Sequence, residues 1–163
     1  MRVVAATAIA LALLTLAGCG FHLRRPARLP PAFDATWLEA ADPYTDFHRA
    51  LDDAMRASGT HFTRTRATAT AVVELLVDDS GQRVLSVSAL NKPTEYEVYY
   101  TVRYRVRFGE HEVLAPQVLT LTRDYSYDAA ALLAKEEEQR LIRAALARDI
   151  AELVVRRLAA LPP

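Results

Sequence analysis

Residues 95–108 read EYEVYYTVRYRVRF and alternate between two kinds of side chain. One set is aromatic or β-branched: Tyr96, Val98, Tyr100, Val102, Tyr104, Val106 and Phe108. The other set is mostly charged or polar: Glu95, Glu97, Tyr99, Thr101, Arg103, Arg105 and Arg107. Because successive side chains of a strand point to opposite faces, this period predicts one long strand with a buried face and a charged face. Such a two-sided strand is typical of antiparallel sheets.

The segments around this strand predict its neighbours in the sheet. Asn91-Lys92-Pro93-Thr94 forms a turn before it, and residues 109–115 form the connection after it. Asp78-Asp79-Ser80-Gly81 interrupts a β-rich stretch and is interpreted either as a turn or as a bulge in one long strand. A polar connection is expected over residues 60–70. Further strands are expected at residues 35–41, 72–77, 84–89 and 118–127.

Two segments have helical periodicity. In the first, Asp42 is expected as the N-cap, Pro43 as the first helical residue and Gly59 as the C-terminal stop. The second begins near Asp128 or Ser126 and contains no Gly or Pro before Pro162. Its core-facing stripe is Ile142, Ala145, Leu146, Ile150, Leu153, Val154, Arg157, Leu158 and Leu161. The predicted fold class is α+β, with two helices packed on one face of a mostly antiparallel sheet of about four strands.

The N-terminus predicts export. Arg2 precedes an apolar run over residues 3–16 that is too short to span a bilayer. The stretch 16–19, Leu-Ala-Gly-Cys, resembles the bacterial lipobox, in which the cysteine is acylated and the signal is cut before it. Cys19 is the only cysteine, so lipidation also consumes a thiol that no disulfide within the chain can protect. Acyl chains on Cys19 would anchor the protein to a membrane.

These features divide the chain into three parts. Residues 1–18 are expected to be a lipoprotein signal peptide, residues 19–33 a lipidated extended tether, and residues 34–163 a single α+β domain. Gly20 follows the cysteine. Enterobacterial lipoproteins that stay at the inner membrane tend to have Asp at this position, so the resemblance implies the outer membrane.

Several functional classes find little support in the residues. The four histidines, His22, His48, His61 and His111, have no metal-ligand spacing, and no GxSxG or phosphate-binding glycine loop is present. We therefore predict no catalytic residue, no metal site and no cofactor. Lys plus Arg and Asp plus Glu both number 20, which argues against a nucleic-acid partner.

Arg103, Arg105 and Arg107 remain as candidates for a contact surface. They lie on the charged face of the long strand, which is either a solvated face that discourages edge pairing or a face that meets a polar, confined partner surface such as the lumen of an outer-membrane barrel. Lys92, in the turn, and Lys135, early in the second helix, are the only lysines. Each is a surface lysine or, if the two converge, part of a phosphate site.

Several strings, taken in order, resemble one family, LptE. They are Leu-Ala-Gly-Cys-Gly-Phe-His-Leu-Arg at 16–24, Asp42-Pro43, Thr94-Glu95-Tyr96, Arg-Asp-Tyr-Ser-Tyr-Asp at 123–128, and Leu133-Ala134-Lys135-Glu136 through Gln139. The resemblance implies an α+β plug inside the barrel of an LptD-type partner, in the outer-membrane translocon that delivers lipopolysaccharide. It also implies that Lys135 contacts lipopolysaccharide. The family's basic turn residue corresponds to about Ala89, and Lys92 is considered as its substitute.

The predicted function is a non-catalytic lipoprotein subunit that plugs an LptD-type barrel and assists lipopolysaccharide binding and insertion. An alternative is a free-standing periplasmic carrier or chaperone for an amphipathic lipid, which would need an apolar cavity and no obligate partner. A lipid hydrolase would require an indispensable Ser, His or Asp.

Overall fold

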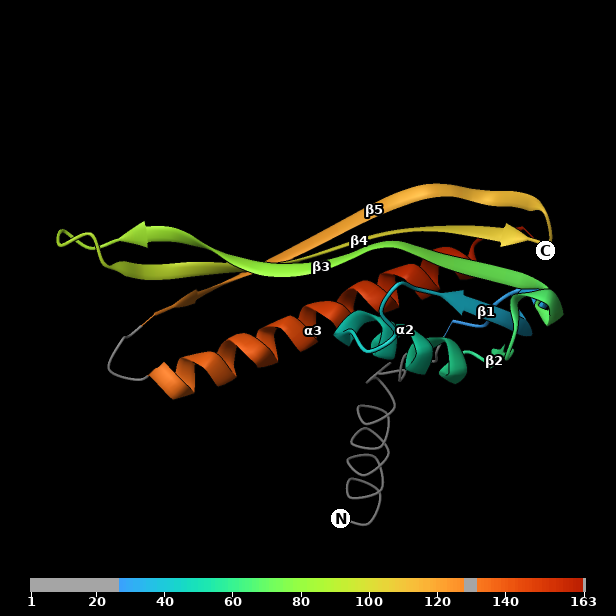
Figure 1. Cartoon of the computed structure of the whole chain (residues 1–163), viewed down its shortest axis with the longest axis horizontal. Coiled ribbons are helices and arrows are strands. Elements are labelled where there is room, and N and C mark those ends of the chain that lie inside the picture. Colours follow the sequence, from blue (N-terminus) through green and yellow to red (C-terminus); the bar gives the residue numbers. More distant parts are fainter. Residues whose placement is uncertain (1–26, 128–131, 163) are drawn as a thin grey trace, which may run out of the picture.

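The computed structural model describes residues 27–127 and 132–162, and in this part of the chain two α-helices lie on one face of a five-stranded sheet (Figure 1). The sheet order is β2-β1-β3-β4-β5; β3, β4 and β5 pair antiparallel, whereas β1 pairs parallel with β2 and β3. The α+β prediction is confirmed, with five strands instead of about four. The elements are η1 (Pro31–Phe33), β1 (Ala35–Glu39), α2 (Asp46–Ala57), β2 (His61–Phe62), η2 (Arg66–Thr68), β3 (Ala71–Val87), β4 (Pro93–Phe108), β5 (His111–Ser126) and α3 (Leu132–Ala159).

The long strand predicted from residues 95–108 is β4. Its alternation separates the two faces as expected, because every second side chain from Val98 to Val106 is at most 2% exposed and points toward the helices. The intervening side chains are half-buried or exposed. The buried face of β4 therefore forms the centre of the core.

The β-rich stretch before it is one continuous strand, β3, which pairs with β4 along its length. The pairing shifts register between Leu75 and Val77, so the bulge lies at Leu76, just before the Asp-Asp-Ser-Gly stretch. The extra residue turns Asp78 to the helix side of the sheet, opposite Val102. Of the two interpretations, one long strand is correct, but its irregularities lie before the Asp-Asp-Ser-Gly stretch and beyond it, between Val84 and Val87, and the stretch itself pairs regularly with β4.

Two expected connections contain strand. β5 begins at His111, which is paired with Phe108, so the connection predicted over 109–115 is only a turn at Gly109 and Glu110. Gly109 has a φ of 55°, which a glycine adopts easily. The connection predicted over 60–70 contains the two-residue strand β2 and the short helix η2, which local periodicity cannot reveal because both are so short.

The first helix starts later than predicted. Its N-cap is Thr45, whose Oγ1 accepts a hydrogen bond from the backbone N–H of His48 (3.0 Å), and the helix begins at Asp46. Asp42 instead accepts a bond from the N–H of Tyr44 (2.8 Å), which makes a local turn ahead of the helix. The predicted stop at Gly59 is confirmed, because Gly59 follows the C-cap with a φ of 99°.

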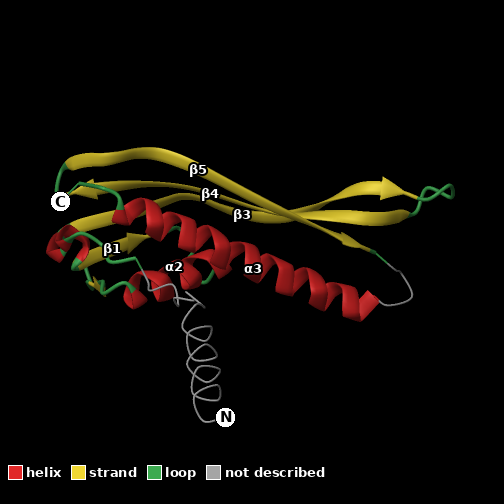
Figure 2. Ribbon diagram, turned by 180° about the vertical axis from the view of Figure 1, so that it is seen from behind, coloured by secondary structure: helices red, strands yellow, loops and turns green. Residues whose placement is uncertain are grey.

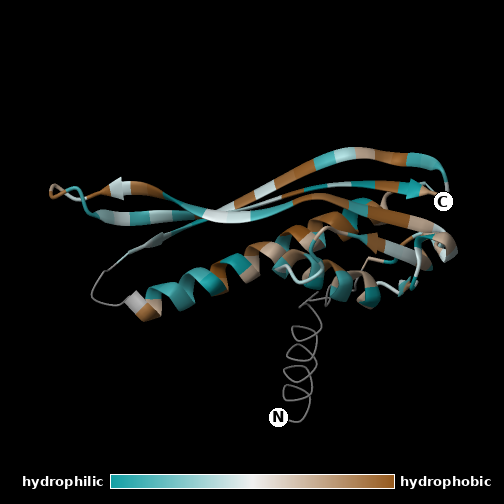
Figure 3. Ribbon diagram, viewed as in Figure 1, coloured by the Kyte–Doolittle hydropathy of each residue, from teal (hydrophilic) through white to brown (hydrophobic). Residues whose placement is uncertain are grey.

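The core lies between the sheet and the helices, and both ends of the described chain contribute to it (Figures 2 and 3). Leu29 and Phe33, within the stretch expected to be a tether, are buried, so the packed part of the chain begins before residue 34. The buried residues of α3 largely follow the predicted stripe and add Ala147, Ala151 and Val155. The signal peptide, Cys19 and the helix start expected at Asp128 lie outside the described residues.

Candidate functional site

The three arginines predicted to face a partner lie on the side of the sheet that the helices leave uncovered. We call it the helix-free face; it consists of the outward side chains of β4 at positions 95, 97, 99, 101, 103, 105 and 107 and their cross-strand neighbours on β3 and β5. Arg103 is exposed, and Arg105 and Arg107 are half-buried. The alternation of β4 thus brings the three arginines to one surface, but their neighbours differ.

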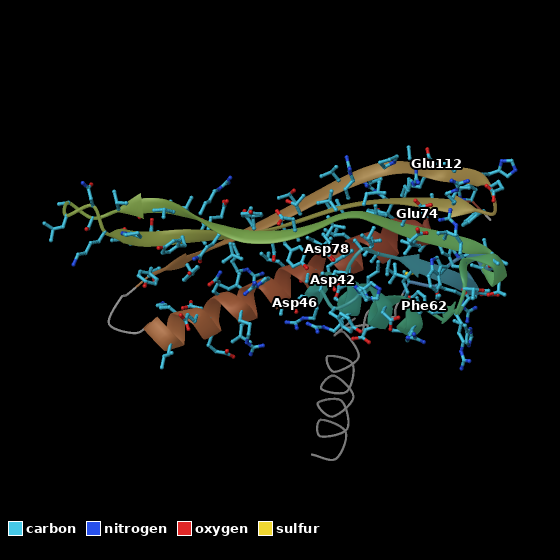
Figure 4. All side chains as sticks on the ribbon, viewed as in Figure 1. Asp42, Asp46, Phe62, Glu74, Asp78 and Glu112 are labelled. Carbon is cyan, nitrogen blue, oxygen red and sulfur yellow. The ribbon has the colours of Figure 1, made fainter. Side chains whose placement is uncertain are left out.

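A row of alternating charges crosses one end of the helix-free face. Arg66 bridges Glu39 (2.6 Å) and Glu74 (3.2 Å), and Arg105 binds Glu74 through its Nε (2.6 Å) and approaches Glu112 (3.8 Å). Figure 4 labels Glu74 and Glu112. The Glu74 side chain is only 8% exposed, and its two oxygens are satisfied by two guanidinium groups. This row therefore fixes Arg105 inside the domain and places a carboxylate beside each of its two arginines.

The other arginines of the face differ in whether a carboxylate pairs with them. The Nη2 of Arg107 donates to the backbone oxygen (2.9 Å) and carboxylate (3.1 Å) of Glu110, and Arg83 forms an ion pair with Glu97 (2.5 Å). Within residues 27–127 and 132–162, no carboxylate forms an ion pair with Arg103. Of the three predicted contact residues, Arg103 is therefore the one whose guanidinium forms no ion pair within the described residues.

The far part of the β3–β4 hairpin has no buried residue. We call residues 76–97 the hairpin arm; all of them are described, and none is buried. The arm ends in a turn where Asn91 has a φ of 56° and where the backbone N–H of Ser88 donates to the oxygen of Lys92 (2.8 Å). Lys92 is exposed. The arm also exposes Val84, Leu85, Val87 and Leu90, so its tip combines apolar side chains with a cation.

A cluster of tyrosines lies where β5 ends beside the arm. The ring of Tyr96 stacks on Tyr125 (centroids 5.8 Å apart) and meets the edge of Tyr127 (5.2 Å). The hydroxyl of Tyr125 donates to Oε1 of Gln82 (2.8 Å). Burial raises the pKa of Tyr125, and nearby Tyr96 and Glu138 raise it further. This cluster therefore packs close to the first turns of α3.

Lys135 lies in those first turns. Its side chain is 18% exposed, and its Nζ binds the carboxylate of Glu138 at 2.8 Å. The β3–β4 turn, which holds Lys92, and the start of α3 lie at the same end of the long axis, with the hairpin projecting farther (Figure 1). The two predicted lysines thus share an end of the molecule, one exposed and one mostly covered.

A second polar cluster attaches α2 to the sheet. The Tyr100 hydroxyl donates to Asp78 (2.8 Å) and accepts from the backbone N–H of Phe47 (3.1 Å), and the Thr45 hydroxyl donates to the other oxygen of Asp78 (2.5 Å). Burial raises the pKa of Tyr100, and the bond to Asp78 adds to the rise. The carboxylate lies near the start of α2 (Figure 4), where negative charge is favourable. Each polar group is used in joining helix to sheet, which indicates a structural role.

The described residues contain no group of three or more His, Cys, Asp or Glu side chains placed to hold a metal ion. No described helix combines the length and apolar character needed to cross a membrane.

Sequence reasoning missed the charge row, the tyrosine cluster and the exposed apolar arm. A signal for the first is Glu74, a single charge within the run AVVELLV at 71–77, because a carboxylate in a buried strand requires a partner. The apolar residues beside the turn at 88–92 were a signal for the third. The tyrosine cluster depends on the register of β4 and β5, in which Tyr96 is paired with Tyr125.

The family model described as LptE: Lipopolysaccharide-assembly matches residues 33–158. A protein of Pectobacterium atrosepticum named LPS-assembly lipoprotein LptE is 30% identical over 152 residues, which are 92% of this chain and 82% of the relative. A protein of the same name from Yersinia enterocolitica is 27% identical over 151 residues, 92% of this chain and 72% of that protein.

Solved structures share the fold. The solution structure of lipoprotein B from Nitrosomonas europaea superposes with a TM-score of 0.72 at 22% identity, covering 86% of this chain and 91% of that one. The crystal structure of a minor lipoprotein from Acinetobacter baumannii gives a TM-score of 0.67 at 21% identity, covering 82% and 97%. At these identities the likeness concerns the arrangement of helices and strands alone.

Proposed function

The chain belongs to the LptE family of lipopolysaccharide-assembly proteins, and on that premise we propose that it is a non-catalytic lipoprotein subunit of the outer-membrane lipopolysaccharide translocon. In this proposal Cys19 carries the lipid anchor, the α+β domain plugs an LptD-type β-barrel from the periplasmic side, and the domain assists lipopolysaccharide binding and insertion. The observation that carries the proposal is the family match over residues 33–158, which begins within η1 and ends one residue before α3 does.

The helix-free face supports the plug. The lumen of a large outer-membrane barrel is polar, so a domain inside it needs a polar surface rather than an apolar one. The helix-free face has charged or polar side chains along β4, and most of its charges are already paired. A paired surface costs less to desolvate against a partner than the same charges left separate would.

The arm end supports contact with lipopolysaccharide, a molecule with both phosphates and acyl chains. Lys92 and Lys135 supply cations at this end, and the arm supplies exposed apolar side chains, of which Leu90 is 80% exposed. We propose that the lysines meet phosphates and that the apolar residues of the arm approach acyl chains. Lys135 has to exchange its bond to Glu138 for one to a phosphate.

The plug is tested by purification of the lipidated chain from envelopes in mild detergent through a tag on the protein. We expect an outer-membrane barrel to be recovered with it in fixed ratio, because a plugged domain has a large contact area. Recovery of the lipoprotein with lipopolysaccharide but without a barrel would favour a free-standing lipid carrier and contradict the plug.

The lipopolysaccharide contact is tested by Lys135→Asp, which reverses the charge at the start of α3. We expect weaker binding of purified lipopolysaccharide and an unchanged melting temperature, because an i,i+3 ion pair on a helix contributes only about 0.2–0.5 kcal/mol. Lys135→Arg, which keeps the charge, is the matched variant and should retain binding. Equal affinities for the wild type and Lys135→Asp would remove Lys135 from the proposed site.

A further inference from the structure

Among the outward arginines of the described sheet, Arg103 differs in its cross-strand neighbours. Arg105 lies opposite Glu74 on the neighbouring strand, and Arg83 lies opposite Glu97. In the row of Arg103, the neighbour on β3 is Val77 and the neighbour on β5 is Val118. The row therefore reads Val-Arg-Val across the three strands, where the other two rows place a carboxylate beside the guanidinium.

Most polar groups next to this row are occupied. In the adjacent row, the hydroxyls of Thr101 and Thr120 bond to each other at 2.9 Å. Asp79, the β3 residue of that row, is exposed and forms no ion pair with Arg103 within the described residues. On the other side along β4, Arg105 is held by Glu74. Val118 is 60% exposed and Val77 half-buried, so apolar side chains flank the cation on both sides. The result is a small patch with one free positive charge between two valines.

We propose that this patch, Arg103 with Val77 and Val118, is the docking point for a carboxylate side chain of a polypeptide partner, and that Arg105 and Arg107 are structural. The proposal rests on the proposed function, since it assigns the contact residue of the face that meets the barrel. The planar guanidinium binds a carboxylate through two parallel hydrogen bonds. The valines exclude water around that pair, as the apolar rim of an interface hot spot does.

Charge complementarity decides the chemistry of the occupant. The paired arginines already have a carboxylate beside them, so an acidic residue of a partner would have to compete with that carboxylate. Arg103 forms an ion pair only if the partner supplies the carboxylate. An uncharged partner residue at that position would leave the guanidinium desolvated without compensation. The partner surface that fits is an Asp or Glu set among apolar side chains.

The test compares Arg103→Glu with Arg148→Glu in the full-length lipoprotein in living cells. Both residues are exposed arginines, and Arg148 lies on α3, the helix that covers the other face of the sheet (Figure 1). We expect Arg103→Glu to reduce the partner recovered with the tagged protein about tenfold or more, with an unchanged melting temperature, and Arg148→Glu to recover nearly as much as the wild type. Equal losses for both variants would mean that recovery follows net charge, and this would overturn the proposal.

A photocrosslinking residue at position 118 gives an independent readout. In the wild-type background it should form an adduct with a polypeptide, and Arg103→Glu should abolish that adduct. If Arg103→Glu recovers the partner as well as the wild type does, Arg103 is not the docking point, although the proposed function stands. If the wild type recovers no barrel, both fail. If Arg103→Glu keeps the partner and loses binding to vesicles containing lipopolysaccharide, the cation serves a lipid phosphate and the polypeptide assignment is wrong.

Discussion

The two ends of the β3–β4 hairpin differ in what holds them. At the base, residues 71–75 of β3 are all buried, and the helix-side residues of β4 from Val98 onward belong to the core. In the hairpin arm, residues 76–97, none is buried. The same two strands thus pass from a part stabilised by apolar burial to a part held by backbone pairing and by cross-strand contacts such as Arg83 with Glu97.

This difference indicates which part of the molecule tolerates local opening and substitution. Regions with few buried apolar contacts open locally at a low free energy, whereas core strands open only with global unfolding. We therefore expect the base to determine the stability of the domain and the arm to be free to adapt its exposed side chains to a ligand.

The largest effect should come from truncating a leucine of the base. Leu75 and Leu85 lie on the same strand, at 9% and 46% exposure. Leu75→Ala should lower the free energy of unfolding by about 2–5 kcal/mol because it leaves a cavity in the core. Leu85→Ala should cost less than about 1 kcal/mol because its side chain is already near water. Urea denaturation of the two variants checks this, and similar costs would mean that the arm is as important to stability as the base.

A smaller effect should mark the place where the arm is attached to α2. Asp78, near the start of the arm, is bonded to Tyr100. Tyr100→Phe removes this bond and the acceptor for the N–H of Phe47, so it should cost about 1–3 kcal/mol of unfolding free energy. The matched variant is Tyr104→Phe on the same face of β4. The Tyr104 hydroxyl is buried, and its charged neighbour within the described residues is Arg157, whose guanidinium does not meet it in hydrogen-bonding geometry.

Tyr104→Phe should therefore be neutral or slightly stabilising, since it removes a buried polar group that makes no well-formed hydrogen bond. Thermal unfolding of the two variants side by side gives the comparison. A loss in Tyr104→Phe as large as that in Tyr100→Phe would show that the hydroxyl at 104 has a partner and would weaken the assignment of Asp78 as the attachment point.

The elements predicted well from the sequence are those with a long, uninterrupted period. β4 alternates without a break, and the stripe of α3 repeats over many turns, so each pattern had a single solution. The start of α2 was not predictable in this way, because Asp42 and Thr45 are both good N-caps. Thr45 is the cap in a structure where its hydroxyl also bonds Asp78, on a strand far along the chain.

The sequence predicted which arginines share a face, but not which of them pair with a carboxylate. Alternation along β4 places Arg103, Arg105 and Arg107 on one face, and the structure agrees. Which arginine meets a carboxylate depends on the register between strands, and that register shifts at Leu76 and again between Val84 and Val87. The sequence shows that β3 is interrupted but not where the extra residue lies, so the pairing of Arg105 with Glu74 and the isolation of Arg103 required the structure.

The smallest expected effect concerns pH and again belongs to the packed part of the molecule. Burial lowers the pKa of His48 in α2, an effect that Asp52, Asp78 and Asp42 partly oppose. Because the folded protein binds this proton less readily than the unfolded chain does, His48 stabilises the fold fully above the unfolded pKa of about 6.5, and this contribution is lost as the pH falls through the lowered folded value.

We therefore expect the free energy of unfolding to decline as the pH falls below about 6.5, and His48→Gln to flatten that decline. The control is His111→Gln, because His111 is exposed at the start of β5; this variant should keep the wild-type slope. Denaturation curves measured across this range decide the matter. If His48→Gln keeps the full slope, the titrating group lies elsewhere, and the start of α2 is less tightly packed against Asp78 and Tyr100 than their hydrogen bonds indicate.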